Sequence, residues 1–220
     1  MAAALPLRIA VVGGGIGGLT LACYLAQEAT GQGNIHITLF ERRPSLDGPD
    51  GGALTIRGEG IEVLRELGLL EGLLGDWATA PRQEDGVSEV VVMRDLLLQL
   101  LCERAGHAIE ANVMVEVTAV REGAEWVELD YRPFLALQGN ELVRNPDPSV
   151  STSTYDLVVG ADGNGPSSQV AQVVVGNPAE ARAEVLPLLV LQALAPQRSS
   201  GAARARSGSG GRSDSGCWPP

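Results

Sequence analysis

Residues 8–41 read RIAVVGGGIGGLTLACYLAQEATGQGNIHITLFE, and this stretch decides the fold. Its opening run, RIAVV, is rich in β-branched residues and ends in glycines, which predicts a short strand. Leu21 and Leu25 follow at helical spacing, and the polar break TGQGN precedes a second strand-like run at Ile35–Phe40. Glu41 stands at the end of that run. The pattern therefore predicts a strand, a helix and a second strand in succession.

The glycines between the first strand and the helix have the spacing G-x-G-x-x-G. In a dinucleotide-binding unit the first glycine allows the tight turn, the second lets a pyrophosphate approach the backbone, and the third lets the helix pack on the strand. The free N–H groups and the positive end of the helix dipole stabilise the diphosphate. We therefore predict that the turn binds a dinucleotide through Gly13, Gly15, Ile16, Gly17 and Gly18.

Glu41 is the second part of this predicted site. A carboxylate at the end of the second strand accepts hydrogen bonds from the hydroxyls of the adenosine ribose and repels a 2′-phosphate, which favours FAD or NAD over NADP. The adjacent Arg42 and Arg43 weaken the case against NADP, because a guanidinium group there could accept a phosphate. A surface glutamate that only ends a strand is the alternative interpretation.

The rest of the chain continues the alternation of strands and helices. Apolar residues at helical spacing predict helices at Gly58–Leu74 and Arg94–Ala105. Short segments with partial alternation predict a small β-meander at Val113–Val143, and the apolar run Tyr155–Ala161 predicts a buried parallel strand. We therefore expect an α/β fold, a doubly wound Rossmann-like domain that spans residues 1–176.

The composition changes after about Gly176. We predict that residues 177–220 form a separate tail, and that Gln197–Pro220, almost wholly Ser, Gly, Ala and Arg, is disordered. The arginines of this tail could tether the protein to RNA, but a solvated tail is the favoured interpretation.

Bulk properties exclude several classes of protein. A chain of 220 residues with 45% hydrophobic residues suits one principal domain, and its net charge of −11 argues against nucleic acid or an anionic membrane as a partner. Cys23, Cys102 and Cys217 are far apart in sequence, odd in number and without the paired spacing of a disulfide framework or a metal site, and we predict no metal site. The start lacks the basic region of a signal peptide, and no apolar run is long enough to span a bilayer. We expect a cytoplasmic protein.

Four segments between residue 8 and about residue 163 resemble the FAD-dependent aromatic-ring hydroxylases, the p-hydroxybenzoate hydroxylase-like monooxygenases. They are the strand-turn-helix unit with LFERRP, then GGALTIRGEGIEVLRELGLLEGL, VVMRDLLLQLLCERAG and DLVVGADG. The resemblance implies an FAD/NAD(P)-binding domain with FAD as cofactor and NAD(P)H as transient reductant. It also implies NAD(P)H-dependent hydroxylation of an aromatic or similar small-molecule substrate.

The resemblance also implies roles for residues far from the glycine turn. Arg94 begins an R-x-x-L-x-x-x-L helix, whose arginine contacts the cofactor near its pyrophosphate and ribityl chain in this family. Asp162 and Gly163 stand where the family has an Asp-Gly pair that serves FAD and NAD(P)H. The serine that follows in the family is displaced here by one or two positions, to Ser167 or Ser168, and the family's arginine is missing.

Other interpretations stay open. The family's later Gly-Asp fingerprint is not found, because Gly75–Asp76 precedes the second fingerprint and is interpreted as a helix stop. The chain is therefore incomplete relative to the family, and a catalytically incomplete FAD-binding fragment, from a truncated or mispredicted chain, is the first alternative. An NAD-binding Rossmann protein of another class is the second. No catalytic acid or base is identified, because His36 and His107 are interpreted as structural or solvated and Cys23 as a core residue.

Overall fold

The computed structural model of the chain describes residues 5–32, 34–48, 51–76, 82–83, 86–138, 141–146, 149–163, 168–175 and 192–194. The disorder predicted for Gln197–Pro220 and the tail's arginines lie outside the described residues. None of the helices in the described part is long and apolar enough to cross a membrane.

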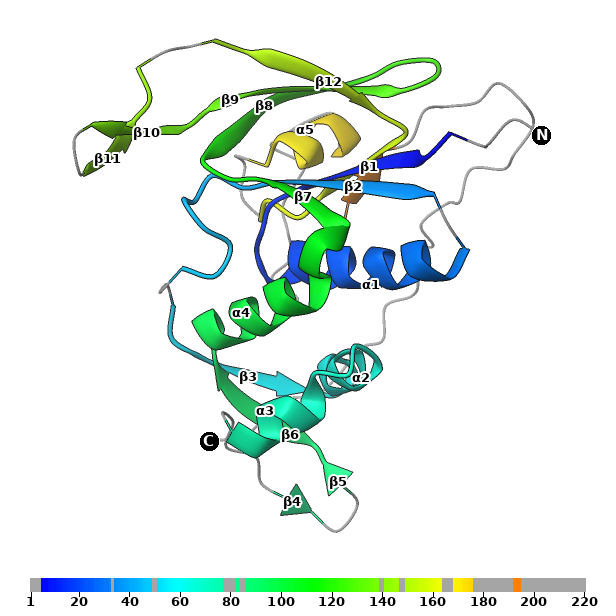
Figure 1. Cartoon of the computed structure of the whole chain (residues 1–220), viewed down its shortest axis with the longest axis vertical. Coiled ribbons are helices and arrows are strands. Elements are labelled where there is room, and N and C mark those ends of the chain that lie inside the picture. The colour runs from blue at the N-terminus through cyan, green and yellow to red at the C-terminus, as the bar shows by residue number, and fades with distance from the viewer. Residues whose placement is uncertain are drawn as a thin grey trace, which may run out of the picture.

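A five-stranded sheet forms the centre of the molecule, in the order β14-β13-β1-β2-β7 (Figure 1). β1 (Leu7–Val12) lies between β2 (Ile35–Phe40) and β13 (Leu157–Gly160) and is parallel to both. β7 (Ile109–Asn112) extends the parallel order beyond β2, whereas β14 (Gln192–Leu194) is antiparallel to β13. The parallel sheet and the strand–turn–helix order confirm the predicted Rossmann-like α/β fold.

Two helices cover one face of this sheet (Figure 1). α1 (Ile16–Gln32) starts directly after the glycine turn, and α4 (Arg94–Ala105) has the bounds predicted from its sequence. Apolar residues three or four positions apart place one face of each helix in a common core. That core includes Leu19, Ala22, Cys23, Leu39, Leu97, Leu98 and Leu101.

The other face of the central sheet is covered by an antiparallel sheet of three strands and by a short helix, α5 (Gln169–Val175) (Figure 1). β8 (Val115–Glu122), β9 (Val127–Pro133) and β12 (Ser151–Tyr155) form this sheet in sequential order. The β-meander predicted for Val113–Val143 is confirmed for β8 and β9, but its third strand, β12, lies beyond the predicted bounds. Apolar side chains fill the space between the layers: Ala10, Val12, Phe40, Val117, Val120, Val127, Leu129 and Val158.

A hairpin interrupts the meander between β9 and β12. Its strands are β10 (Leu135–Gln138) and β11 (Glu141–Arg144), and it extends from the end of the meander sheet in Figure 1. Leu137 and Leu142 form a cross-strand pair that is exposed to solvent.

A smaller lobe lies below α4 in Figure 1. Its antiparallel strands β3 (Ala53–Arg57) and β6 (Glu89–Met93) bury Val90 and Val92 against the helix core. Two helices and two short strands lie between β3 and β6 in the sequence: α2 (Glu59–Glu66), α3 (Leu70–Asp76), β4 (Arg82–Gln83) and β5 (Gly86–Val87). A 3-10 turn, η1 (Gly106–Ala108), follows α4.

The prediction of one helix over Gly58–Leu74 is wrong, because the structure has two helices there. Gly68 adopts φ +72° between α2 and α3, a conformation that ends a right-handed helix. The N–H of Leu69 then donates to the carbonyl of Leu64, which closes the end of α2. α3 is described as far as Asp76, and the residues that follow lie outside the described part, so the interpretation of Gly75–Asp76 as a helix stop stays a prediction.

The prediction of a single strand over Tyr155–Ala161 also needs correction. The run divides at Asp156 into the end of β12 and the start of β13, which belong to different sheets. Asp156 joins them to β1, because its carboxylate accepts the N–H of Arg8 at 2.8 Å and its own N–H donates to the Arg8 carbonyl at 2.9 Å. The apolar run alone gave no sign of this change of sheet. β3, β6 and β7 were not predicted either, because each is short and lacks a long alternating pattern.

The core beneath the central sheet should dominate stability. Leu98→Ala removes a side chain with 0% exposure from the α1–α4 core, and we expect it to lower the free energy of unfolding by about 2–5 kcal/mol. Denaturation in urea measures this loss. Leu142→Ala, at a position with 45% exposure on the hairpin, is the matched control and should change stability by less than about 0.5 kcal/mol. Equal losses in both variants would contradict the assignment of the core.

Candidate dinucleotide site

The glycine turn meets the end of β13 at Gly13. The N–H of Gly13 donates to the carbonyl of Phe40 at 2.8 Å, which fixes the turn beside the end of β2. Gly13 has φ +108°, and a Cβ atom on it would lie 2.3 Å from the carbonyl oxygen of Ala161. A side chain at Gly13 is therefore excluded by both backbone conformation and space.

Gly18 is closely packed, whereas Gly15 borders open space. A Cβ atom on Gly18 would lie 1.9 Å from the carbonyl oxygen of Gly13, so the first turn of α1 packs directly on the glycine turn. A Cβ atom on Gly15 would meet no other atom within 4 Å, and Gly15 lines a cavity. The three glycines thus have the separate steric tasks predicted from their spacing: tight turn, open cradle and close helix packing.

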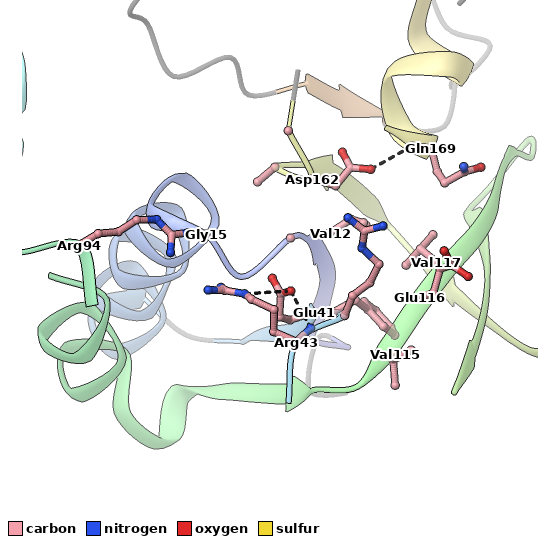
Figure 2. Close-up of a pocket in the computed structure, with 15 residues that line it drawn as sticks. Val12, Gly15, Glu41, Arg43, Arg94, Val115, Glu116, Val117, Asp162 and Gln169 are labelled. Atoms are coloured by element: carbon pink, nitrogen blue, oxygen red, sulfur yellow. Dashed lines mark hydrogen bonds and ion pairs between the residues drawn. The ribbon is translucent and has the colours of Figure 1, made fainter. Parts of the chain in front are cut away.

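The cavity has a volume of about 360 Å³ and lies beyond the carboxyl ends of β1, β2 and β13 (Figure 2). Its outer wall comes from β8, with Val115, Glu116 and Val117. The carboxyl ends of parallel strands are where ligands of open α/β sheets bind. The predicted site residues that line the cavity are Gly13, Gly15, Glu41, Arg42, Arg94, Asp162 and Gly163.

The other predicted contact residues lie behind the cavity lining. Ile16 packs against the helix core, and Gly17 and Gly18 are buried in the first turn of α1. Their place in the structure is to seat the helix on the turn. Any ligand contact by these residues stays a prediction.

Glu41 is held against the glycine turn rather than directed to solvent. Its Oε2 accepts the N–H of Gly14 at 2.7 Å, and its Oε1 accepts the backbone N–H of Arg43 at 2.9 Å. Only 11% of its side chain is exposed. A Cβ atom on Gly14 would lie 3.1 Å from Oε2 and 2.5 Å from Cδ2 of Leu46. A side chain at Gly14 would therefore displace Leu46 and crowd Glu41, a constraint that the G-x-G-x-x-G spacing does not identify.

Burial acts to raise the pKa of Glu41, but the hydrogen bonds from Arg43 and Gly14 and the positive charge of Arg43 outweigh it and lower that pKa below its ordinary value. The carboxylate is therefore ionised at neutral pH. The pKa of Glu41 is lower in the folded protein than in the unfolded chain, so its ionisation stabilises the fold, fully so above the pKa of the unfolded chain. This stabilisation is lost as the pH falls through the folded-state pKa.

The two arginines after Glu41 have different surroundings. The guanidinium of Arg43 is occupied by the protein, because its Nη2 donates to the Gly14 carbonyl at 2.9 Å and its Nε lies 3.2 Å from Glu41 Oε1. The guanidinium carbon of Arg42 lies 5.8 Å from the centre of the Phe134 ring, a cation–π distance. Of the two, Arg42 is the more exposed residue.

Asp162 caps the start of α5. Its Oδ1 accepts the hydroxyl of Ser168 at 2.6 Å, and its Oδ2 accepts the N–H of Gln169 at 2.9 Å (Figure 2). The Ser168 hydroxyl in turn accepts the N–H of Ala171 at 3.0 Å, as an N-cap residue does. Ser168, one of the two candidates for the displaced serine of the Asp-Gly motif, thus contacts Asp162, whereas the other, Ser167, lies outside the described residues.

Gln169 lines the cavity beside Asp162 and was not predicted as a site residue. A serine directly before an apolar run is an N-cap signal, and this signal could have placed the start of α5. It could not have shown that the helix start faces the cavity.

Arg94 reaches the cavity from the start of α4. Its backbone N–H donates to the carbonyl of Gly52 at 3.1 Å. Its side chain passes over Gly51, which has φ +120° and where a Cβ atom would lie 2.7 Å from Arg94 Cδ. Figure 2 shows the guanidinium of Arg94 extending from α4 toward Gly15. Arg94 and the glycine turn therefore lie on the same side of the cavity.

The histidines and cysteines of the described part do not line this cavity. His36 is exposed and pairs with Glu110 at 3.4 Å, and His107 is exposed in a 3-10 turn. Burial raises the pKa of Cys23 and of Cys102 to about 11, so both are thiols at neutral pH. Within the described ranges, no group of His, Cys, Asp and Glu side chains could hold a metal ion.

Comparison with known proteins identifies a related class. Residues 11–50 match the family described as NAD(P)-binding Rossmann-like domain. An FAD-dependent monooxygenase of Sarocladium schorii is 28% identical over 181 residues, which cover 71% of this chain and 40% of that protein. The chain thus spans about 40% of the length of this curated relative.

Solved structures of the same class share the fold. Aklavinone-11 hydroxylase, in a ternary complex with FAD and aklavinone, gives a TM-score of 0.58 at 19% identity over 79% of this chain and 36% of that chain. The tetrameric form of 2-methyl-3-hydroxypyridine-5-carboxylic acid oxygenase gives a TM-score of 0.52 at 25% identity over 74% of this chain and 41% of that chain. Together these matches confirm the resemblance to FAD-dependent monooxygenases over the amino-terminal part of the chain.

Alanine at two of the glycines should separate folding from cavity shape. Gly18→Ala forces Cβ against the Gly13 carbonyl, and we expect a loss of stability of about 1–3 kcal/mol, the usual cost of overpacking. Gly15→Ala meets open space and should leave stability within about 1 kcal/mol of wild type. Thermal and urea denaturation of both variants measure the difference. A larger loss from Gly15→Ala than from Gly18→Ala would contradict the described turn.

Proposed function

We propose that the chain binds FAD in this cavity and forms the dinucleotide-binding part of a flavin-dependent monooxygenase, which uses NAD(P)H to hydroxylate an aromatic or similar small molecule. The observation that carries the proposal is the gathering of Gly15, Glu41, Arg94 and Asp162 around one cavity at the carboxyl ends of parallel strands. These residues come from four separate segments of the chain. A role in stabilising the fold, assigned to each residue separately, does not explain why all four lie around one cavity.

The adenosine end of the cofactor would lie at Glu41. Its carboxylate is fixed by Gly14 and Arg43, and it lines the cavity. The carboxylate has about four acceptor positions, and the internal partners use two on Oε1 and one on Oε2, so a ribose hydroxyl can bind Oε2 without displacing them. Arg43 pairs with Glu41 and so is less suited to accept a 2′-phosphate. This arrangement supports FAD over NADP as the resident nucleotide.

The diphosphate would lie at Gly15. The open space above Gly15 gives a phosphate access to the backbone, and the first turn of α1 directs its N–H groups to the same place. Arg94 extends toward Gly15 and supplies positive charge. A diphosphate at this point also reduces the electrostatic cost of placing Arg94 near the positive end of the helix.

Asp162 and Gly163 would contact the part of the cofactor beyond the diphosphate. Ser168 and the N–H of Gln169 hold the Asp162 carboxylate in place, so its orientation does not depend on the ligand. Gln169 stands at the cavity wall with an amide that can donate and accept hydrogen bonds. The residues present therefore fit the dinucleotide.

The flavin, when bound, supplies the redox chemistry between NAD(P)H, oxygen and the substrate. The side chains of the chain bind and orient the cofactor, and the wall from β8 limits the access of water to the cavity. No described side chain in the cavity is assigned as a catalytic acid or base, because Glu41 and Asp162 are both engaged in structural hydrogen bonds and Glu116 pairs with Arg132 at 2.9 Å.

The ribose contact can be tested by removing the carboxylate. Glu41→Ala should weaken FAD binding by about 10- to 100-fold, because a charged hydrogen bond contributes about 1.5–3 kcal/mol. Titration calorimetry or quenching of flavin fluorescence measures the dissociation constant. Glu62→Ala, which removes an exposed carboxylate on α2, is the matched control and should leave it unchanged. Unaltered affinity in Glu41→Ala would mean that Glu41 is not the ribose acceptor.

The activity can be tested on the purified chain. We expect yellow protein with one FAD per chain and FAD-dependent oxidation of NADH or NADPH that increases when phenolic substrates are added. FAD binding without such oxidation would favour an FAD-binding chain without turnover. A colourless protein that binds NAD but not FAD would favour a Rossmann protein of another class and would contradict the proposal.

A further inference from the structure

Arg43 joins the end of β2 to the glycine turn through a closed ring of contacts. Its Nη2 donates to the Gly14 carbonyl at 2.9 Å, and its Nε lies 3.2 Å from Oε1 of Glu41. The N–H of Gly14 donates to the other carboxylate oxygen, Oε2, at 2.7 Å, which closes the ring. Figure 2 shows the contacts between Arg43 and Glu41. One side chain therefore holds both the glycine turn and the predicted ribose acceptor.

This arginine is not explained by stability alone. Its side chain is only 23% exposed, and its Nη1 is a buried nitrogen with no hydrogen-bond partner among the described residues. Burying a charged donor without an acceptor has a cost in folding free energy, which a neutral side chain of similar size would avoid. Buried unsatisfied groups are few in native proteins, and a role in a functional site is one of the reasons for them.

We propose that Arg43 is a positioning residue of this site, whose guanidinium fastens the Glu41 carboxylate to the Gly14 N–H and so fixes the acceptor of the adenosine ribose before the nucleotide binds. The inference rests on the proposed function, because it takes the ribose of a dinucleotide to bind at Glu41. Without the Arg43 guanidinium, only the backbone N–H groups of Gly14 and Arg43 would hold the carboxylate. Fixing it in advance reduces the entropy lost on binding.

The charges around Glu41 also support a positioning role for Arg43. The pKa of Glu41 is raised by burial and lowered by the backbone N–H, charge and side-chain hydrogen bond of Arg43 and by the Gly14 N–H, with a net lowering. The other charged groups around the cavity are Arg42 beside it, Arg94 from α4, Glu116 from β8 and Asp162 after β13. Removal of the Arg43 side chain would leave burial opposed mainly by the two backbone N–H groups, so the Glu41 pKa should rise.

The test compares Arg43→Gln and Arg43→Lys with wild type in the full chain. Arg65→Gln is the matched control, because it removes an exposed arginine that pairs with Glu62 on α2, away from the cavity. One measurement is the carbon NMR titration of the Glu41 carboxyl in the ligand-free protein, assigned by its loss in Glu41→Gln. The other is the FAD dissociation constant between about pH 8 and about pH 5, the range in which a raised carboxyl pKa becomes visible.

We expect Arg43→Gln to move the Glu41 titration to higher pH and to weaken FAD binding about 10-fold at neutral pH, the effect of losing one charge-assisted contact. Its affinity should fall further toward about pH 5, where wild type stays level. Arg43→Lys keeps the charge and should restore most of the titration and the level pH profile, but its single ammonium does not bridge Glu41 and the Gly14 carbonyl, so FAD binding should stay weaker than in wild type. A merely structural arginine would change the thermal stability without changing the pH profile.

The possible failures are distinguishable. Wild type that binds FAD, with an Arg43→Gln variant whose Glu41 titration and FAD pH profile are unchanged, would overturn this inference alone. Wild type that binds neither FAD nor ADP would overturn the proposed function and this inference with it. If Arg43→Gln does not fold, Arg43→Lys decides, because a lysine that alters neither affinity nor stability would contradict the need for a guanidinium bridging Glu41 and the Gly14 carbonyl.

Discussion

The contact between Gly13 and the end of β13 is the constraint on which the rest of the site depends. The turn after β1 can lie against the Ala161 carbonyl only because Gly13 has no side chain. That approach lets β1 lie between β2 and β13 in register, so that the residues after all three strands emerge at one edge. Glu41 and Asp162 therefore reach the cavity from opposite sides of the same turn.

The meander sheet forms one wall of the cavity at this edge. The meander packs on the face of the central sheet opposite α1, and Phe40 contacts it through Tyr131, with ring centres 5.0 Å apart, and through Tyr155 at 6.1 Å. This packing places β8 beside the glycine turn, where Val115 and Val117 form a wall of the cavity. A parallel sheet with helices alone would leave the strand ends more open to solvent.

The chain as a whole is acidic, with a net charge of −11, but positively charged groups lie at the cavity. The charge of the site is therefore set by its own residues and not by the net charge of the chain. Carboxylates and guanidinium groups both line the cavity, and the ionised state of Glu41 is maintained by specific hydrogen bonds and the charge of Arg43 against the effect of burial. The Asp162 carboxylate also has partners within the protein, a serine hydroxyl and a backbone N–H. Both carboxylates are thus fixed before any ligand is present, which is the condition for selective binding of a polar ligand.

The sequence alone determined the βαβ unit, the steric task of each glycine in G-x-G-x-x-G and the bounds of α4, because these follow from local spacing and periodicity. Only the tertiary structure decided that Gly14 and Arg43 hold Glu41, that Ser168 caps α5 beside Asp162, and that β8 walls the cavity. These contacts join distant segments, as do Arg8 and Asp156, 148 positions apart. Such pairs are brought together by the packing of distant segments, and they have no regular spacing in the sequence from which they could be predicted.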